Sequence, residues 1–194
     1  MVFPDQLKKY RFILASKSPR RQYLLKELGI PFELRTKEVD EHFPAELKRE
    51  EIPLYLSKLK ADAFEGELDE NTIVITADTI VWINDHVLNK PADHAEAVQM
   101  LRELSGNRHE VYTGVCLKSK NKEVCFHART DVYFKKLSDA EIDFYINTCQ
   151  PFDKAGAYGA QEWVGYVGIE KIEGTYFNVM GLPLYELYRE LVKF

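Results

Sequence analysis

The stretch on which the fold of this chain depends reads Phe12-Ile13-Leu14-Ala15-Ser16-Lys17-Ser18-Pro19-Arg20-Arg21. An apolar run of the strand type ends in small hydroxyl residues, and a proline then opens a helical segment. Ser18 suits the N-cap of that helix, and Pro19 suits its first position, where the missing N–H is no loss. Gly29 is well placed to end the helix. The stretch therefore predicts a strand, a turn and a helix in succession.

Two adjacent arginines, Arg20 and Arg21, fall in the first turn of this expected helix. The N-terminal end of a helix carries the positive end of its dipole, so it favours anions and disfavours cations. Arginines, serine hydroxyls and the N–H groups of a first turn together indicate an anion site, most naturally for phosphate. The alternative is a capped helix with two solvated arginines, and the stretch alone leaves both interpretations open.

Composition limits the class of protein. The 194 residues are 45% hydrophobic and 29% charged, which is typical of one globular domain with a substantial core. The net charge of −5, without a basic run, disfavours general binding to nucleic acid or to anionic membranes. No stretch has the apolar length of a membrane span, and the mixed, polar residues 1–10 do not resemble a signal peptide. We therefore expect a cytoplasmic protein.

Cysteines and histidines give no sign of a metal site. Cys116, Cys125 and Cys149 are widely spaced, and their odd number argues against a disulfide framework. Cys116 and Cys125 are able to face each other across a hairpin, but we predict small buried thiols. The five histidines are scattered without the i, i+4 spacing of metal ligands.

A second informative stretch is Thr72-Ile73-Val74-Ile75-Thr76, an apolar, β-branched run typical of a strand buried on both faces. It leads into Ala77-Asp78-Thr79, and a second run covers residues 80–83. A lone aspartate between two such runs is unfavourable unless it is paired, hydrogen-bonded or metal-bound. Asp78 is therefore either a functional residue at a strand end or an aspartate with a structural hydrogen bond.

The rest of the chain predicts alternating elements. Strands are expected at 31–35, 86–88, 109–118, 123–134 and 166–173, with a hairpin turn at Asn84-Asp85 and a second hairpin joining 109–118 to 123–134. Helices are expected at 52–64, after Asp93, and from Ser138 to about Thr148, where Ser138 and Glu141 form a capping box. Lys60 lies on the first of these helices, and Glu41 lies in an acidic loop that is either simply solvated or a partner for metal or water.

A third stretch combines small residues with polar ones, and reads Pro151-Phe152-Asp153-Lys154-Ala155-Gly156-Ala157-Tyr158-Gly159-Ala160-Gln161. Small residues let a backbone come close to a ligand or to another element. Asp153, Lys154 and Gln161 provide its polar side chains.

Taken together, these motifs resemble those of the Maf family of nucleoside triphosphate pyrophosphatases. The resemblance rests on Ala15 to Arg21 and on further matches in the order of the family, namely Asp40-Glu41, Lys60-Ala61, Ala77-Asp78-Thr79, Lys90-Pro91, Leu104-Ser105-Gly106, Thr113-Gly114-Val115, Asp153 to Gly159, and Gly181-Leu182-Pro183. So many ordered matches over nearly the whole chain are far more specific than any single motif.

The resemblance implies a cytoplasmic enzyme that cleaves a nucleoside triphosphate between the α- and β-phosphates, giving a monophosphate and pyrophosphate. It also implies a divalent cation, Mg²⁺ or Mn²⁺, and a single mixed α/β domain over residues 1–194. That domain would hold an elongated, twisted sheet flanked by helices, with two lobes around a central cleft. We expect no nucleic-acid or membrane partner, and the resemblance leaves a homodimer open.

Residue by residue, Asp78 matches the catalytic proton acceptor of the family, and Glu41 matches its acidic site residue. The positions that contact phosphate are matched by Ser16, Arg20, Lys60 and Lys90. Glu41 and Asp78 are the candidates to hold the metal. Three further positions separate the subfamily that cleaves dTTP and UTP from its relatives, and they are matched by Arg21, Thr79 and Gln161.

One departure concerns the residue after Gln161. The family usually continues there with glycine, whereas this chain reads Gln161-Glu162-Trp163. The fine base preference is therefore open. Two other functions stay open as well: a pyrophosphatase for modified guanine nucleotides, and a non-catalytic nucleotide-binding regulator of cell division.

Overall fold

The computed structural model of the chain describes residues 5–194. The strands are β1 (Arg11–Leu14), β2 (Phe32–Leu34), β3 (Thr72–Ile83), β4 (His86–Leu88), β5 (Arg108–Lys118), β6 (Glu123–Phe134) and β7 (Ile169–Glu173). The α-helices are α1 (Pro19–Glu27), α2 (Glu51–Asp62), α3 (His94–Leu104), α4 (Asp139–Cys149), α5 (Trp163–Gly168), α6 (Tyr176–Val179) and α7 (Leu184–Val192). Short 3₁₀ helices cover η1 (Asp5–Leu7), η2 (Pro151–Asp153) and η3 (Ala155–Ala157).

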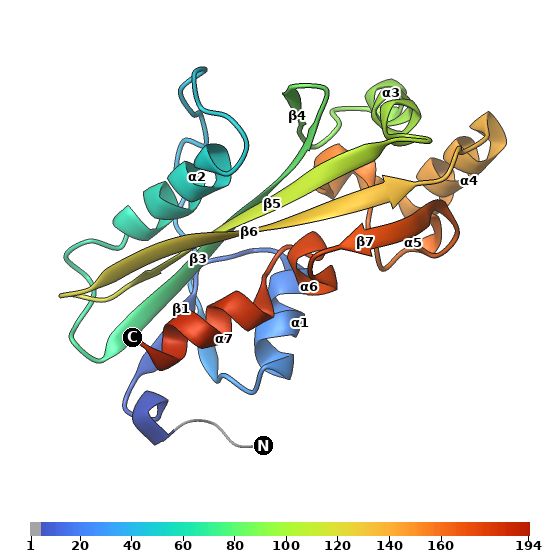
Figure 1. Ribbon diagram of the computed structural model, residues 1–194. Helices are drawn as coiled ribbons and strands as arrows, with labels where there is room; N and C mark the ends of the chain where they lie inside the picture. The colour runs from blue at the N-terminus through green and yellow to red at the C-terminus, as the bar shows by residue number, and fades with distance from the viewer. Residues whose placement is uncertain (1–4) are drawn as a thin grey trace. The chain divides into compact units, whose positions relative to one another are not determined.

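The seven strands described within residues 5–194 belong to one mixed sheet, in the order β2-β1-β3-β5-β6-β7, with β4 paired to β3 (Figure 1). β1 lies parallel to both β2 and β3, whereas β4 and β7 are antiparallel to their neighbours β3 and β6. β5 and β6 form the expected hairpin through a turn in which Ser119 N–H donates to the Lys122 carbonyl at 2.8 Å. The predicted mixed α/β sheet flanked by helices is confirmed.

The chain divides into two compact units. Among the described residues, the first comprises 5–78, 113–128 and 181–194, and the second comprises 79–112 and 129–180. Strands β3, β5 and β6 each contribute residues to both units. The expected cleft between two lobes stays a prediction, as does the single domain.

Local signals explain most of the element boundaries. Pro19 opens α1, and Gly29, with a φ of 78°, follows its last turn. Asn84 and Asp85 both adopt positive φ, as the tight β3–β4 hairpin requires. Ser138 and Glu141 form the predicted capping box at the start of α4.

Two expectations about strands were wrong. The strand predicted at 166–173 begins only at Ile169, because α5 takes up residues 163–168. Asp78 does not lie at a strand end, since β3 continues through it from Thr72 to Ile83. β3 is flanked by β1 over its first residues and by β4 over its last ones, so it stays paired on both sides of Asp78.

The cysteine prediction was also wrong, because Cys116 and Cys125 form a disulfide. They lie on the two neighbouring strands β5 and β6, nine residues apart in sequence, with their Cα atoms 4.1 Å apart. Cys149 is a free cysteine. An odd number of cysteines says nothing about the register of a hairpin, and it is the register that placed these two side chains opposite each other.

A histidine lies in the core of the second unit. His109 is 1% exposed and stacks edge-on against Phe134 and Tyr158, while its Nε2 lies 2.8 Å from the Tyr158 hydroxyl. Burial lowers the pKa of His109 from 6.5 to about 3. Its buried Nδ1 has no partner within residues 5–194, so a second proton there would be a buried charge without an acceptor.

Stability should therefore fall in acid. Below pH 6.5 the unfolded chain binds a proton at His109 that the folded chain binds only near pH 3, so stability is lost as the pH falls through this window. His109 changes the free energy of unfolding by at most about 1.4 kcal/mol per pH unit. We expect His109→Gln to flatten the pH dependence of urea unfolding between pH 3 and 6.5. His127→Gln, at an exposed position, should keep the original slope.

Candidate active site

Asp78 lies just beyond the end of a parallel strand pair. The last register pair of β1 and β3 is Leu14 with Ile75, and the Ala15 N–H donates to the Ile75 carbonyl at 2.9 Å. β1 ends at Leu14, whereas β3 continues through Asp78 to Ile83. Ligands in open α/β sheets bind beyond the carboxyl ends of the strands. Ser16 and Asp78 therefore lie at the edge where such a ligand is expected.

Helix α2 is docked directly on the sheet of the first unit. The Thr76 hydroxyl donates to the Ser57 carbonyl at 2.6 Å. On β5, a Cβ added at Gly114 would lie 2.3 Å from the backbone of Pro53, so only glycine permits this close approach. Asp78 faces the same side of β3 as Thr76, and Lys60 is one helical turn beyond Ser57. The docking thus brings Lys60 to Asp78.

Lys60 joins two carboxylates. Its Nζ lies 2.6 Å from an oxygen of Asp78 and 3.1 Å from an oxygen of Glu41. The side chains of Lys60 and Asp78 are 15% and 13% exposed, whereas that of Glu41 is 55% exposed. Three predicted residues from separate parts of the sequence therefore meet at one point. The resemblance marked them one by one, but only the docking of α2 shows that the lysine bridges the carboxylates.

Arg21 anchors helix α1 to the first unit. Its Nε donates to the Gly181 carbonyl at 2.7 Å, and its Nη1 donates to the Ala77 carbonyl at 2.9 Å. Burial lowers the pKa of Arg21, and the nearby charge of Asp78 opposes that effect. The side chain thus holds the residue next to Asp78 through its backbone. The predicted role of Arg21 in base selection stays a prediction.

We expect Arg21→Lys to destabilise the protein. An ammonium on a flexible stem does not reproduce the fork that reaches the carbonyls of Ala77 and Gly181 together. Losing one charge-assisted hydrogen bond corresponds to about 1.5–3 kcal/mol. Urea unfolding at neutral pH measures this change, and an unaltered midpoint would show that the two bonds do not stabilise the fold.

The turn before α1 is built as the sequence predicts, with one difference. Ser18 is the N-cap, yet within the described chain its side chain makes no capping hydrogen bond. The hydroxyl of Ser16, which is 6% exposed, instead accepts the Ser18 N–H at 3.2 Å. Arg20 is the second residue of α1 and is partly exposed. The predicted anion site therefore consists of a buried serine hydroxyl, a helix N-terminus and an arginine.

The second unit gathers the other predicted residues. The Gly156 N–H donates to the carbonyl of Asn89, which directly precedes Lys90. A Cβ added at Gly156 would lie 3.1 Å from the side chain of Val81, which shares a face of β3 with Thr79. The segment that leads to Gln161 thus lies against the surroundings of both Lys90 and Thr79. Lys90 is exposed, and Thr79 and Gln161 are partly exposed.

Predicted site residues therefore fall into one group in each unit. Ser16, Arg20, Arg21, Glu41, Lys60 and Asp78 belong to the first, and Thr79, Lys90 and Gln161 belong to the second. That the two groups act on one substrate stays a prediction.

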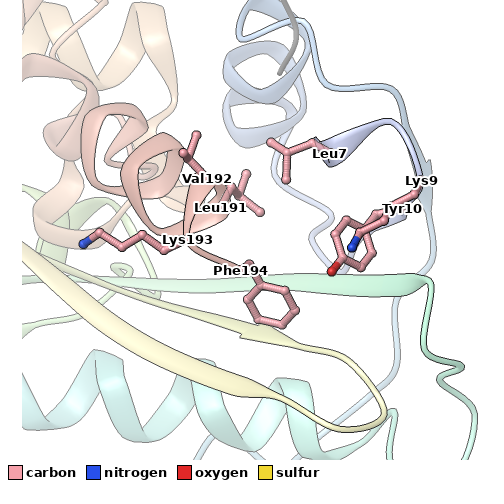
Figure 2. Close-up of a pocket in the computed structure, with 7 residues that line it drawn as sticks. All are labelled: Leu7, Lys9, Tyr10, Leu191, Val192, Lys193 and Phe194. Carbon is pink, nitrogen blue, oxygen red and sulfur yellow. The ribbon is translucent and has the colours of Figure 1, made fainter. Parts of the chain in front are cut away.

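Other features of the described chain fit the chemistry less well. Cys116, Glu123 and Cys125 are the one cluster of possible metal-binding groups found in residues 5–194, but the two sulfur atoms are bonded to each other. A pocket of about 190 Å³ is lined by residues near both ends of the chain (Figure 2), and these are Leu7, Lys9, Tyr10, Leu191, Val192, Lys193 and Phe194. Ligand pockets usually measure about 300–1,000 Å³, so it is too small for a nucleoside triphosphate. None of the helices described is long and apolar enough to span a bilayer.

Comparison with known proteins decides the family. The sequence profile of Maf-like proteins matches residues 11–194. The chain belongs to the Maf family. It is 49% identical over 191 residues to a dTTP/UTP pyrophosphatase of Parabacteroides distasonis, covering 98% of this chain and 99% of the relative. Proteins with the same name in Bacteroides thetaiotaomicron and Flavobacterium johnsoniae are 50% and 51% identical, over 96% and 98% of this chain and 97% and 98% of theirs.

Membership of the Maf family accounts for the order of the motifs. The motifs from Ala15-Ser16 to Gly181-Leu182-Pro183 all fall within the matched residues 11–194. The resemblance on which the site residues were chosen is thus confirmed, while the role of each residue stays a prediction.

Proposed function

We propose that this Maf protein hydrolyses dTTP and UTP to the monophosphate and pyrophosphate. Full-length relatives about half identical to it carry the name dTTP/UTP pyrophosphatase. The observation that carries the proposal is the contact of Lys60 with both Asp78 and Glu41, next to Ala77, whose carbonyl accepts a hydrogen bond from Arg21 of α1. It combines a base, a second carboxylate and a cation at a site suited to phosphate.

The phosphates would be held mainly by positive groups. A triphosphate carries about four negative charges, and catalysis of phosphoryl transfer is largely positioning and charge stabilisation. Ser16 and Arg20 supply a hydroxyl and a guanidinium at the start of α1. Lys60 supplies an ammonium from α2, and Lys90 is the second lysine assigned to the phosphates.

Asp78 would accept the proton of the attacking water. The water oxygen bonds to the α-phosphorus, and the bond from that phosphorus to the bridging oxygen breaks. Pyrophosphate leaves with the electron pair of that bond, and the proton of the water moves to an oxygen of Asp78. Before substrate binds, Lys60 occupies that carboxylate at 2.6 Å. Phosphates that draw the Lys60 ammonium toward themselves would free Asp78 to act as base.

Glu41 and Asp78 are suited to hold Mg²⁺ or Mn²⁺. Both carboxylates reach the same cationic atom, Lys60 Nζ, so their oxygens already converge on one positive centre. One or two carboxylates together with substrate phosphates form the usual Mg²⁺ environment. When bound, such a cation supplies charge compensation for the phosphates and a more acidic water.

Three residues are assigned to base choice, namely Gln161 and Thr79 in the second unit and Arg21 in the first. The side-chain amide of Gln161 offers a donor and an acceptor, which suits the Watson–Crick edge of uracil or thymine. Thr79 would narrow the base pocket, and Arg21 completes the set implied by the resemblance. We also propose that the protein acts in the cytoplasm. A homodimer is an expectation that a sizing column coupled to light scattering would test.

A panel of nucleotides tests the proposal. The purified protein is incubated with Mg²⁺ or Mn²⁺ and with dTTP, UTP, dCTP, CTP, dGTP and modified purine triphosphates, and pyrophosphate and monophosphate are quantified. We expect pyrophosphate chiefly from dTTP and UTP. Pyrophosphate mainly from modified purines would favour the guanine-nucleotide alternative, and none from any nucleotide would favour the regulator. Orthophosphate without pyrophosphate would mean that another bond is cut.

A further inference from the structure

Gln161 lies in a tight turn of the second unit. The Glu162 N–H donates to the Gly159 carbonyl at 3.0 Å, which closes residues 159–162 into one turn. The Gln161 carbonyl accepts a hydrogen bond from the Tyr166 hydroxyl of α5. Within residues 5–194 the side-chain amide of Gln161 makes no hydrogen bond, and the residue is partly exposed. Its backbone is therefore anchored while its amide is available to a ligand.

A single buried hydroxyl holds both ends of this turn. Tyr145, on α4, is 0% exposed. Its hydroxyl accepts the Gly159 N–H at 3.0 Å and donates to a carboxylate oxygen of Glu162. Burial and the bond to Glu162 raise the pKa of Tyr145 well above its usual 10, so this hydroxyl keeps its proton. The Tyr145 hydroxyl donates this proton in its hydrogen bond to the carboxylate of Glu162, so Tyr145 connects Gly159 to Glu162.

Lys154 holds the same carboxylate from the other side. Its side chain is only 9% exposed, and its Nζ lies 3.0 Å from Glu162 and 2.6 Å from Asp153. Asp153 is 60% exposed, whereas Glu162 is 22% exposed. The pair of Lys154 and Glu162 is therefore the shielded one, and removing a single partner from such a pair is far more disruptive than losing an exposed contact.

Two glycines show how closely the turn is packed. A Cβ added at Gly159 would lie 2.9 Å from the side chain of Glu162. A Cβ added at Gly165 would lie 2.1 Å from the carbonyl oxygen of Ala160. The side chain of Glu162 thus packs against Gly159 of the turn, and Gly165 of α5 packs against Ala160 of the same turn. A displaced Glu162 would move the backbone that carries Gln161.

We propose that Glu162, held by Lys154 and Tyr145, is a positioning residue that fixes Gln161 for selection of the base. The inference rests on the proposed function, because it assigns Gln161 to the base of a pyrimidine nucleotide. It gives a role to the residue at which this sequence departs from the usual family pattern. Glu162 itself touches no phosphate in this scheme, so it governs discrimination between bases and leaves the phosphate chemistry unchanged.

Glu162→Gln tests this role. The amide is the same size and still accepts a bond from Tyr145, but it does not neutralise Lys154. We expect kcat/KM for UTP to fall about tenfold, as for the loss of about 1.4 kcal/mol of positioning, while kcat/KM for CTP stays within about twofold. The ratio of the two values should therefore fall. Glu170→Gln, the same change at an exposed residue of β7, should leave both values unchanged.

Tyr145→Phe provides a second variant, because it removes the hydroxyl and retains the ring. We expect the Gly159 amide to lose protection from hydrogen exchange and the UTP-to-CTP ratio to fall as it does in Glu162→Gln. Thermal unfolding of each variant identifies any that fail to fold. An unchanged ratio in folded Glu162→Gln, or an equal fall for UTP and CTP, would overturn the inference.

Binding separates this inference from the proposed function. Dissociation constants for α,β-imido-UTP and α,β-imido-CTP are measured by calorimetry for the original protein and for Glu162→Gln. A protein that hydrolyses neither nucleotide but prefers the uridine analogue, with a smaller preference in the variant, would refute the proposed reaction and support the positioning role. A protein that hydrolyses UTP but shows the same preference before and after substitution would refute the positioning role alone.

Discussion

Asp78→Asn should reduce kcat for dTTP and UTP at least about 100-fold, the usual consequence of removing a general base. The amide matches the carboxylate in shape, but it does not take the proton of the attacking water. The fold should survive, because β3 keeps its pairing with β1 and β4 on either side of residue 78. Steady-state kinetics with a pyrophosphate readout measure the loss, and circular dichroism confirms the fold.

A control separates chemistry from charge. Asp143→Asn makes the same change on the exposed side of α4 and should leave kcat unaltered. Turnover of Asp78→Asn close to that of the original protein would remove Asp78 as the base. The catalytic function would then have to be sought in Glu41, the other carboxylate in contact with Lys60.

Lys60→Met should lower kcat/KM about 100- to 1,000-fold, the range found when one preorganised donor is removed from a transition-state charge. Methionine retains most of the length and packing of the side chain but not its ammonium. Two effects act together, since the phosphates lose a cation and the carboxylates of Asp78 and Glu41 lose the group that draws them together. Kinetics with UTP measure the loss.

The matched control is Lys120→Met, at an exposed residue in the turn between β5 and β6, which should keep full activity. A double-mutant cycle adds a sharper result. Because Lys60 and Asp78 are in contact, their effects should not add, and the double variant should be less impaired than the product of the two single losses. Full additivity would contradict a shared role.

Much of the fold could be predicted because its signals are local. The β-branched run at Thr72 to Thr76, the proline at residue 19 and the capping box at Ser138 each depend on neighbouring residues only, and each appears in the structure as expected. The strand predicted to begin at Tyr166 was wrong because its signal was not decided locally. Its short apolar segment suits a strand or a helix equally well, and packing of α5 against Ala160 through Gly165 settled it as helix.

The site shows the same division. Ordered motifs were enough to choose Ser16, Glu41, Lys60 and Asp78 one at a time. The sequence alone does not predict that the ammonium of Lys60, on α2, lies between the carboxylates of Glu41 and Asp78. That depends on Gly114, whose missing Cβ lets the start of α2 approach β5. A glycine in a strand is a signal of close approach, and it was available in the sequence.

What the sequence by itself determined is the family, the order of the elements and the residue types available for phosphate chemistry, because these depend on local pattern and on motif order. Only the tertiary structure decided which of those residues touch. In the structure, Arg21 donates hydrogen bonds to the carbonyls of Ala77 and Gly181. Glu162 accepts a hydrogen bond from Tyr145 and forms an ion pair with Lys154. The contacts of Arg21 join residues far apart in the chain, and that of Glu162 with Tyr145 joins two separate helices, so they are fixed by the docking of helices, which no short stretch of sequence contains.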